Sequence, residues 1–224
     1  MIISKGSLKF IRLRRVDSEL VREWRNSPKI AQFMEYREYI TPEMQEAWFN
    51  SVNNQNNLYM LIESGGKKIG LLNAKDIDWE KKNLEGGLFF WDESLWNTEM
   101  PLKIVMTFTE FGLRFFHGFT MYAHILKSNE RAIRFNKELG FELCEGQEDV
   151  VNQLYSATRE TYYAKGAKLR KAFYTLTGKE PLKILFEPED YRSKIADHIE
   201  PHIDYSVITH IREFDGSKEF TLEF

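Results

Sequence analysis

The stretch N-E-R-A-I-R-F-N-K-E-L-G-F, residues 129–141, constrains the fold more than any other part of the chain. It begins with an asparagine, which favours an N-cap, and its apolar residues recur at the spacing of one helical face. Gly140 suits the left-handed residue that ends a helix, and Phe141 then folds back onto it. The sequence therefore predicts a basic, amphipathic helix over 129–139 that stops abruptly.

The composition is that of an ordinary globular protein. The chain has 224 residues, a formal net charge of −3, 42% hydrophobic residues and 29% charged residues, which excludes disordered, collagen-like and coiled-coil classes. The balanced charge argues against nucleic acid as a partner. The chain has no signal-peptide pattern and nowhere about 18 consecutive apolar residues, so we expect a cytoplasmic protein with no membrane partner.

Cysteine and histidine give no metal site. Cys144 is the only cysteine, which excludes a disulfide or a thiolate metal cluster within one chain. It follows the glycine of the helix end in an expected strand, where a packing role is favoured over a nucleophilic one. His198 and His202 are four residues apart, but Pro201 interrupts the helix that would align them. We expect surface histidines and no bound metal.

Periodicity and turn residues indicate an order of elements. They predict a strand (8–13), two helices (17–27, 42–52), three strands (58–62, 68–77, 84–91), a long buried helix (101–116), a strand (119–126) and the helix 129–139. This order is typical of an α+β protein with a mixed central sheet flanked by helices. The helix 101–116 makes a crossover, so the fourth and fifth strands are expected to be parallel.

We divide the chain into a domain of residues 1–159 and a small C-terminal α/β extension of residues 160–224, an accessory unit. The extension is predicted to contain a helix, a strand (182–186), a short helix (188–199) and a hairpin turned at Asp215–Gly216. Four residues form an apolar helical stripe: Tyr162, Leu169, Phe173 and Leu176. The stripe is expected to pack on the sheet or on a second subunit of a homodimer. Three lysines beside it fit a solvated face better than a phosphate site: Lys165, Lys168 and Lys171.

The order of elements and the motif N-x-x-A-x-x-F-x-x-x-L-G-F at 129–141 resemble the GNAT superfamily of acetyl-CoA-dependent N-acetyltransferases, from about residue 8 to residue 159. A second set of motifs is W-R-N-S-P at 24–28, Met34, I-T-P-E at 40–43 and W-F at 48–49. It resembles the subgroup that acts on nucleotide-linked aminosugars. Ribosomal-protein N-terminal acetyltransferases share a looser version.

The resemblance implies where acetyl-CoA, the cosubstrate, is held. In the family the fourth and fifth strands splay apart, the pantetheine arm enters the gap, and E-G-G-L at 85–88 suits such a bulge. Unpaired N–H groups there would bind the thioester oxygen. The implied cosubstrate contacts are Gly87, Leu88, Asn97, Thr98 and Asn129. The loop 96–101 lacks the glycines with which the family holds the diphosphate, and it carries Glu99 and Pro101.

The chemistry of amine acetylation needs a base and a partner for the departing sulfur. Glu85 is the expected base, acting through one water, with a solvated strand residue as an equally weighted alternative. Asn136 stands where the family often has a tyrosine acid, and an amide can donate a hydrogen bond to sulfur but cannot give up a proton. Tyr122 is the expected substitute acid, unless it is a core residue.

The implied substrate contacts are Trp24, Arg25, Asn26, Met34 and Gln45, the last standing where aminosugar enzymes often have histidine. Around Met34, an aromatic segment of Phe33, Tyr36 and Tyr39 would stack on a nucleotide base or belong to the helix and loop core. We expect direct acetyl transfer from acetyl-CoA to a primary amine of a small molecule, a nucleotide-linked aminosugar. The alternatives are a peptide N-terminal acetyltransferase and a non-catalytic binding protein of the same fold.

Overall fold

Within residues 1–32, 34, 36–178 and 180–223, which the computed structural model describes, eleven strands form one continuous mixed sheet. Their order across the sheet is β10-β11-β9-β1-β2-β3-β4-β5-β6-β8-β7. The strands are β1 (Ile2–Lys5), β2 (Leu8–Arg12), β3 (Leu58–Ser64), β4 (Lys67–Asp78), β5 (Asn83–Phe90), β6 (Thr120–Leu126), β7 (Glu142–Leu143), β8 (Asn152–Ala157), β9 (Leu182–Phe186), β10 (His210–Phe214) and β11 (Ser217–Leu222). The predicted mixed sheet with flanking helices is confirmed.

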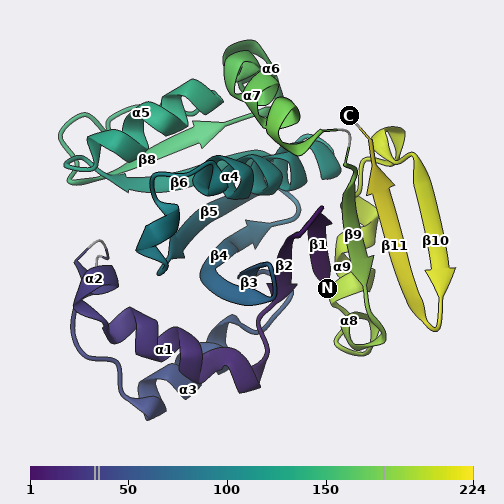
Figure 1. Cartoon of the computed structure of the whole chain (residues 1–224), viewed down its shortest axis with the longest axis horizontal. Helices are drawn as coiled ribbons and strands as arrows, with labels where there is room; N and C mark the ends of the chain where they lie inside the picture. The colour runs from purple at the N-terminus through teal and green to yellow at the C-terminus, as the bar shows by residue number, and fades with distance from the viewer. Residues whose placement is uncertain (33, 35, 179, 224) are drawn as a thin grey trace.

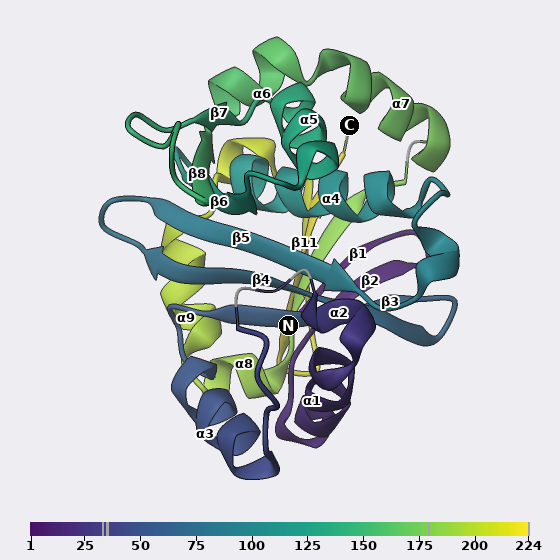
Figure 2. The ribbon, with the colours of Figure 1, turned by 90° about the vertical axis from the view of Figure 1, so that its left-hand side faces the viewer.

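Helices cover both faces of the sheet (Figure 1). They are α1 (Ser18–Asn26), α2 (Pro28–Ala31), α3 (Pro42–Val52), α4 (Met100–Glu110), α5 (Glu130–Leu139), α6 (Arg159–Lys165), α7 (Ala167–Thr177), α8 (Pro188–Arg192) and α9 (Ile195–Ile199). Figure 2 shows α4 to α7 on one side of the central strands and α1 to α3 on the other. Among the described parts of the chain, no helix is long and apolar enough to cross a membrane.

Alternation along the strands separates two apolar clusters, one on each face of the sheet. The larger cluster includes Leu84 of β5 together with Phe108 of α4. The smaller one lies on the side of α1 and α3 and contains Trp91, Leu71 and Phe49. Side chains at even positions of β5 therefore face α4, and those at odd positions face α1 and α3.

The predicted ends of α5 are confirmed. Asn129 caps α5, because its side-chain oxygen accepts a hydrogen bond from the backbone N–H of Ala132 at 3.1 Å. Gly140 has a φ of 100° at the C-terminal end of the same helix. Thr41 caps α3 by accepting from the N–H of Met44. These local contacts explain why the sequence alone defines both helices.

Other elements differ from the prediction. Strand β1 was not predicted, and the helix expected at 188–199 is split at Lys194, whose φ of 60° interrupts it. The long helix beginning near Pro101 is α-helical only to Glu110 and continues as a π-helical turn, Phe111–Phe115. The predicted turn at Asp215–Gly216 joins β10 to β11, and these two residues have φ of 49° and 72°.

One arginine holds the end of the π-helical turn. The guanidinium of Arg159 donates hydrogen bonds to the carbonyl oxygens of Leu113, Arg114 and Phe116 at 2.8 to 3.0 Å. It also donates to a carboxylate oxygen of Asp204 at 2.7 Å. Carbonyl groups at a helix end have no partners within the helix, so this side chain satisfies three of them at once.

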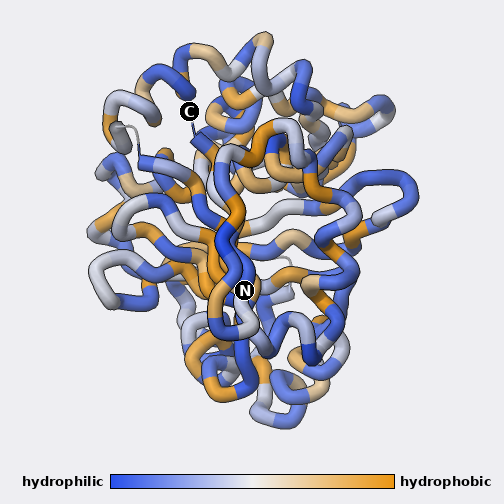
Figure 3. The backbone as a smooth tube through the Cα atoms, turned by 90° about the vertical axis from the view of Figure 1, so that its right-hand side faces the viewer, coloured by the Kyte–Doolittle hydropathy of each residue, from blue (hydrophilic) through white to orange (hydrophobic). Residues whose placement is uncertain are grey.

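The C-terminal residues lengthen the same sheet. Strand β9 pairs with both β1 and β11, and Phe173 of α7 belongs to the larger apolar cluster. Leu176, the last member of the predicted stripe, is 45% exposed. The division of the chain at residue 159 stays a prediction. Figure 3 views the sheet from the β10 side, where hydrophilic and hydrophobic residues follow one another along the chain.

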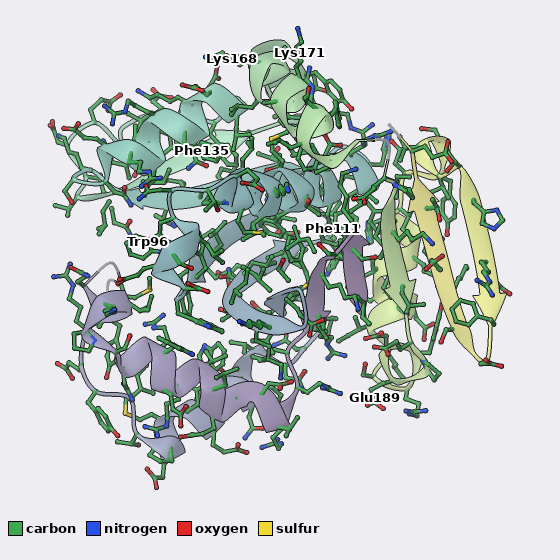
Figure 4. The ribbon with its side chains drawn as sticks, viewed as in Figure 1. Trp96, Phe111, Phe135, Lys168, Lys171 and Glu189 are labelled. Atoms are coloured by element: carbon green, nitrogen blue, oxygen red, sulfur yellow. The ribbon has the colours of Figure 1, made fainter. Side chains whose placement is uncertain are left out.

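The lysines of α7 lie on its outer face. Lys168 and Lys171 are exposed, and Figure 4 shows them at the top of the molecule, pointing away from the sheet. Lys165 at the end of α6 pairs with Glu142 of β7. This arrangement supports the expected solvated face.

We predict that Gly140→Ala lowers the free energy of unfolding more than Gly65→Ala. Both glycines have positive φ, so each substitution costs about 1 to 2 kcal/mol in backbone strain. At Gly140 the added Cβ would also lie 2.5 Å from the carbonyl oxygen of Thr161, whereas at Gly65 nothing lies within 4 Å. Urea unfolding of both variants measures the difference, and equal losses would contradict the packing argument.

We predict that Asp204→Asn destabilises the protein at neutral pH but not at pH 2. Burial opposes ionisation of Asp204, but hydrogen bonds from Ser206 and Arg159 outweigh it and lower the pKa of this carboxyl group to about 2. A folded-state pKa below the unfolded value gives stability above about pH 4, which is lost as pH falls towards 2. The variant should lose about 2 kcal/mol at pH 7. Denaturant unfolding across this pH range tests it, with the exposed Asp149→Asn as the control that should change little.

Candidate active site

Strands β5 and β6 separate after a short parallel contact. Residues 83–85 of β5 pair with residues 120–122 of β6, the last pair being Glu85 and Tyr122. Beyond this pair β5 continues along β4 to Phe90, and β6 continues along β8 to Leu126. The parallel pairing and the splay expected from the sequence are both confirmed, and we call this separation the opening.

The pairing of β4 with β5 identifies the backbone groups that face the opening. The N–H of Trp91 donates to the carbonyl oxygen of Ile69 at 3.0 Å, so odd positions of β5 direct their backbone groups to β4. Gly86 and Leu88 therefore direct theirs towards β6 and the opening. Leu88 lies where the sequence predicted a cosubstrate contact. The backbone groups of Gly87, another predicted cosubstrate contact, face β4 instead.

The glycine pair allows close packing on both faces of β5. A Cβ added at Gly86 would lie 3.0 Å from the ring of Phe108 in α4. A Cβ added at Gly87 would lie 3.0 Å from the side-chain oxygen of Asn73 in β4. Glycine at both positions lets neighbouring groups approach the backbone beside the opening.

Three polar side chains meet where the strands part. Glu85 Oε1 lies 3.0 Å from Lys75 Nζ and 3.1 Å from His124 Nδ1. Burial favours neutral Lys75, but hydrogen bonding and charge attraction from Glu85 outweigh it and raise the pKa of this lysine. We call Lys75, Glu85 and His124 the Glu85 cluster. Its carboxylate is 19% exposed and its imidazole 40% exposed, so the imidazole is the more accessible group.

Sequence reasoning placed Glu85 and Tyr122 at the site but missed Lys75 and His124. Tyr122 is the register partner of Glu85, so both side chains project from the same face of the sheet. His124 follows Tyr122 by two residues and shares that face. The register of two parallel strands was the missing signal, because it depends on pairing between distant segments.

An aromatic wall lies on the same face of the sheet. The rings of Trp24 and Trp91 stack with centroids 5.5 Å apart and an angle of 3° between their planes. Trp48 and Tyr59 meet edge to face at 5.0 Å. Burial raises the pKa of Tyr59, which keeps its hydroxyl group protonated.

Two buried nitrogen atoms on this face have no hydrogen-bond partner among the described residues: Arg25 Nε and Asn73 Nδ2. The guanidinium of Arg25 lies 5.8 Å from the ring centre of Phe89, and burial lowers the pKa of this arginine. Buried donors in native proteins usually have an acceptor. These two are therefore candidates for binding oxygen atoms of a ligand.

The other predicted substrate contacts have structural partners. Asn26 exchanges two hydrogen bonds of 2.8 Å with the backbone of Ile40. Gln45 is buried, and its amide donates to the carbonyl and hydroxyl oxygens of Ser18. We therefore assign Asn26 and Gln45 to the packing of α1, its following loop and α3. Met34 packs against the smaller apolar cluster.

The rest of the predicted aromatic segment is only partly described. Phe33 lies outside the described residues. Tyr36 and Tyr39 are 44% and 67% exposed, and the hydroxyl group of Tyr39 accepts a hydrogen bond from Arg22.

The loop before α4 carries the predicted diphosphate contacts. Thr98 accepts a hydrogen bond from the N–H of Met100, and Asn97 is exposed. Arg131 of α5 donates to the carbonyl oxygen of Trp96 at 2.8 Å, which brings a positive charge to this loop. Figure 4 labels Trp96 there and Phe135 on the helix that carries Arg131. Sequence reasoning missed Arg131 although it lies within the N-capped helix.

An ion pair lies at the start of α4. Asn136, the predicted hydrogen-bond donor to sulfur, lies on α5. Lys103 Nζ lies 3.4 Å from a carboxylate oxygen of Glu99. The amide nitrogen of Asn136 donates to the carbonyl oxygen of Ala132 at 2.9 Å. The amide nitrogen carries a second N–H, so its role as a donor to sulfur stays a prediction.

The described part of the chain contains no group of three His, Cys, Asp or Glu side chains placed to hold a metal ion. His198 and His202 instead pack against the ring of Trp79, with centroids 5.4 and 4.9 Å away. Cys144 is half-buried, as expected of a packing residue at the end of β7.

Known structures share this fold. Spermidine N-acetyltransferase from Vibrio cholerae, in complex with CoA and spermine, is 17% identical, with a TM-score of 0.55, over 70% of this chain and 99% of that one. A chimera of SpeG from Vibrio cholerae and hSSAT is 14% identical, with a TM-score of 0.58, over 70% and 99%. A domain from Methanocaldococcus jannaschii is 20% identical, with a TM-score of 0.53, over 67% and 97%. At these identities the likeness establishes the fold.

A search of curated proteins found no match. The sequence does match a family model. The model described as an acetyltransferase (GNAT) domain matches residues 8–142, more than half of the chain, and it includes the opening, the Glu85 cluster and α5. The chain therefore belongs to the GNAT acetyltransferase family, as an acyltransferase whose cosubstrate is acetyl-CoA.

Proposed function

We propose that this acetyltransferase acetylates the primary amine of a nucleotide-linked aminosugar. The observation that carries the proposal is the position of the Glu85 cluster. It lies at the last pair before β5 and β6 separate, on the face that also holds the aromatic wall and Arg25. An amine bound on this face would reach a group held in the opening.

The residues at the opening fit the acyl end of acetyl-CoA, which supplies its acetyl group as a thioester. The backbone N–H groups of Gly86 and Leu88 face the opening and would donate to a carbonyl oxygen that gains negative charge. The loop before α4, where the diphosphate of acetyl-CoA would lie, carries charges of both signs. Arg131 supplies a positive charge at the loop before α4, and Glu99 supplies a negative one.

The face of the sheet that holds the aromatic wall and Arg25, which we call the acceptor face, favours a ligand with a ring system and oxygen atoms. Trp24 and Phe89, which are half-buried, offer flat apolar surface on which a base or sugar can stack, while the buried Trp91 supports both rings. The unpartnered donors of Arg25 and Asn73 suit phosphate or hydroxyl oxygens.

The charges on this face argue against a polyamine, the acceptor named for the Vibrio cholerae enzyme. A polyamine carries several positive charges, and on this face it would meet the cations of Arg25 and Lys75. The carboxylate of Glu85 is already paired with Lys75. Like charges repel more strongly where they are partly buried than in open water, so a neutral or anionic acceptor fits better.

We predict that the wild-type protein acetylates a UDP- or dTDP-aminosugar faster than it acetylates spermidine or a peptide N-terminus. Arg25→Gln should raise KM for the nucleotide acceptor about tenfold with a smaller effect on kcat, because it removes a binding contact rather than a proton-transfer group. Steady-state assays measure both constants, with the exposed Arg14→Gln as control. Preference for spermidine or peptide, with the aminosugars inert, would refute the proposed acceptor.

We also predict opposite effects of two charge changes on coenzyme A binding. Arg131→Gln should weaken binding and Glu99→Gln should tighten it, each by up to about fivefold, as expected for exposed charges. Calorimetry with coenzyme A measures the affinities, and Lys137→Gln, near the other end of α5, is the matched control. No binding by the wild type at millimolar coenzyme A would favour the alternative of a non-catalytic protein.

A further inference from the structure

We propose that His124 is the catalytic residue that takes the proton from the acceptor ammonium group, and that Glu85 is the residue that positions it. This assignment rests on the proposed function and revises the sequence-based prediction that Glu85 is the base. It is carried by the geometry of the Glu85 cluster.

One oxygen atom of the Glu85 carboxylate already has two partners. A single oxygen atom, Oε1, lies within 3.1 Å of both Lys75 Nζ and His124 Nδ1. Glu85 belongs to the last pair of the β5–β6 ladder and is 19% exposed. An ammonium group approaching this carboxylate would have to compete with a lysine cation that is already in place.

His124 is the more accessible member of the cluster. It lies two residues beyond Tyr122 on β6, in the part of the strand that no longer pairs with β5, and its side chain is 40% exposed. It therefore lies beside Glu85 where the opening begins, on the face where the amine would bind.

The contact with Glu85 selects the reactive atom of the imidazole. A nitrogen facing a carboxylate carries hydrogen, so Nδ1 holds the N–H of the neutral ring and Nε2 holds the lone pair. When Nε2 takes a proton, the nearby carboxylate stabilises the resulting imidazolium. Glu85 is thus the third group that orients a base, and Lys75 in turn keeps the Glu85 carboxylate oriented and charged.

The protons and electrons of the transfer balance. One proton leaves the ammonium nitrogen for Nε2, and the freed lone pair forms the bond to the thioester carbonyl carbon. The carbon–sulfur bond breaks, and sulfur leaves with its electron pair. The second proton lost from nitrogen reaches sulfur through water, and the imidazolium returns the first to solvent. Each turnover releases one thiol, one amide and one proton.

The charged and titratable groups around His124 come from several elements. Glu85 faces it from β5, Lys75 lies behind Glu85 on β4, and Tyr122 is on its own strand. Asp76, also on β4, lies 3.5 Å from Lys75 Nζ, and the charges of Lys75, Asp76, Glu85 and Arg25 all act on Tyr59 of β3. On β8 the register partner of His124 is the apolar Leu154. The pH response of the site therefore depends chiefly on Glu85 and Lys75.

Two substitutions distinguish the roles by their order of effect. His124→Asn should lower kcat about a hundredfold or more with little change in KM, because no proton acceptor remains. Glu85→Gln should lower kcat only about tenfold, because its amide oxygen still accepts from Nδ1 and only the charge is lost. If Glu85 is itself the base, the order reverses, since glutamine cannot take a proton. The reversed order, or an unaffected His124→Asn, would overturn the assignment.

The pH profile is the second readout. In the wild type kcat/KM should rise with pH as His124 loses its proton. Glu85→Gln removes a negative charge, so this rise should move to lower pH, while Lys75→Met removes a positive charge and should move it to higher pH. His210→Asn, on the outer strand β10, is the control that should leave the profile unchanged. Profiles that do not move in either cluster variant would exclude the coupling.

A third measurement does not require activity. The proton NMR titration of the His124 ring in the free protein should move to lower pH in Glu85→Gln, and thermal unfolding shows whether each variant is folded. A wild type that acetylates no amine would refute the proposed function, while this titration still tests the Glu85–His124 pair. An active wild type with an unshifted titration would refute the pair alone.

Discussion

The separation of β5 from β6 is the feature on which the site depends. Buried backbone amides need hydrogen-bond partners, and each of these strands satisfies one side through β4 or β8. After the pair formed by Glu85 and Tyr122, their facing sides are left for another partner. Elsewhere the ladders continue across the sheet, so this is the place where side chains of the α1 and α3 face can meet a group lying between two strands.

Packing from both faces is adapted to this separation. Phe108 and Met121 lie against Gly86 on the side of α4, and Asn73 lies against Gly87 on the other side. Larger residues at the two glycine positions would push these neighbours away. Gly86 and Gly87 permit an irregular strand, and they also let neighbouring side chains pack closely against it. These close contacts hold the opening in place.

The C-terminal segment supports the helix beneath the opening. Tyr162 and Tyr174 donate hydrogen bonds to Glu110, the last residue of α4, at 2.6 and 3.0 Å. Burial, together with this carboxylate, raises the pKa of both tyrosines. Arg159 adds its contacts to the following π-helical turn. These links join α6 and α7 to α4, so residues beyond the family match contribute to the position of the helix that packs on Gly86.

Much of the fold could be predicted because its signals are local. The cap and glycine of α5, the cap of α3 and the turn at Asp215–Gly216 each depend on a few neighbouring residues. The insertion of β9 beside β1 could not be predicted, because it pairs segments nearly the whole chain apart. The same limit hid His124, whose partner is defined only by strand register.

Asn26 and Gln45 show a second limit of prediction from sequence, because residue type alone does not separate a ligand contact from a structural one. Their residue types suit a ligand as well as they suit the backbone and hydroxyl groups that they contact. Only the hydrogen bonds made in the folded chain decide between these uses. Arg25, which precedes Asn26 in the same motif, retains a buried nitrogen without a partner among the described residues. Neighbouring residues of one motif therefore divide into those that build the acceptor face and those that remain available to bind on it.

The electrostatics of this face link the acceptor to the mechanism. The only carboxylate of the Glu85 cluster is shared between a lysine and a histidine, and the exposed Asp76 lies 3.5 Å from the same lysine, so a cationic substrate would have to compete with a positive charge already in place. An acceptor bound through its oxygen atoms and rings does not need that charge for affinity. In the proposed reaction the carboxylate would then serve the imidazole during proton transfer, and binding and chemistry would use different side chains of the same face.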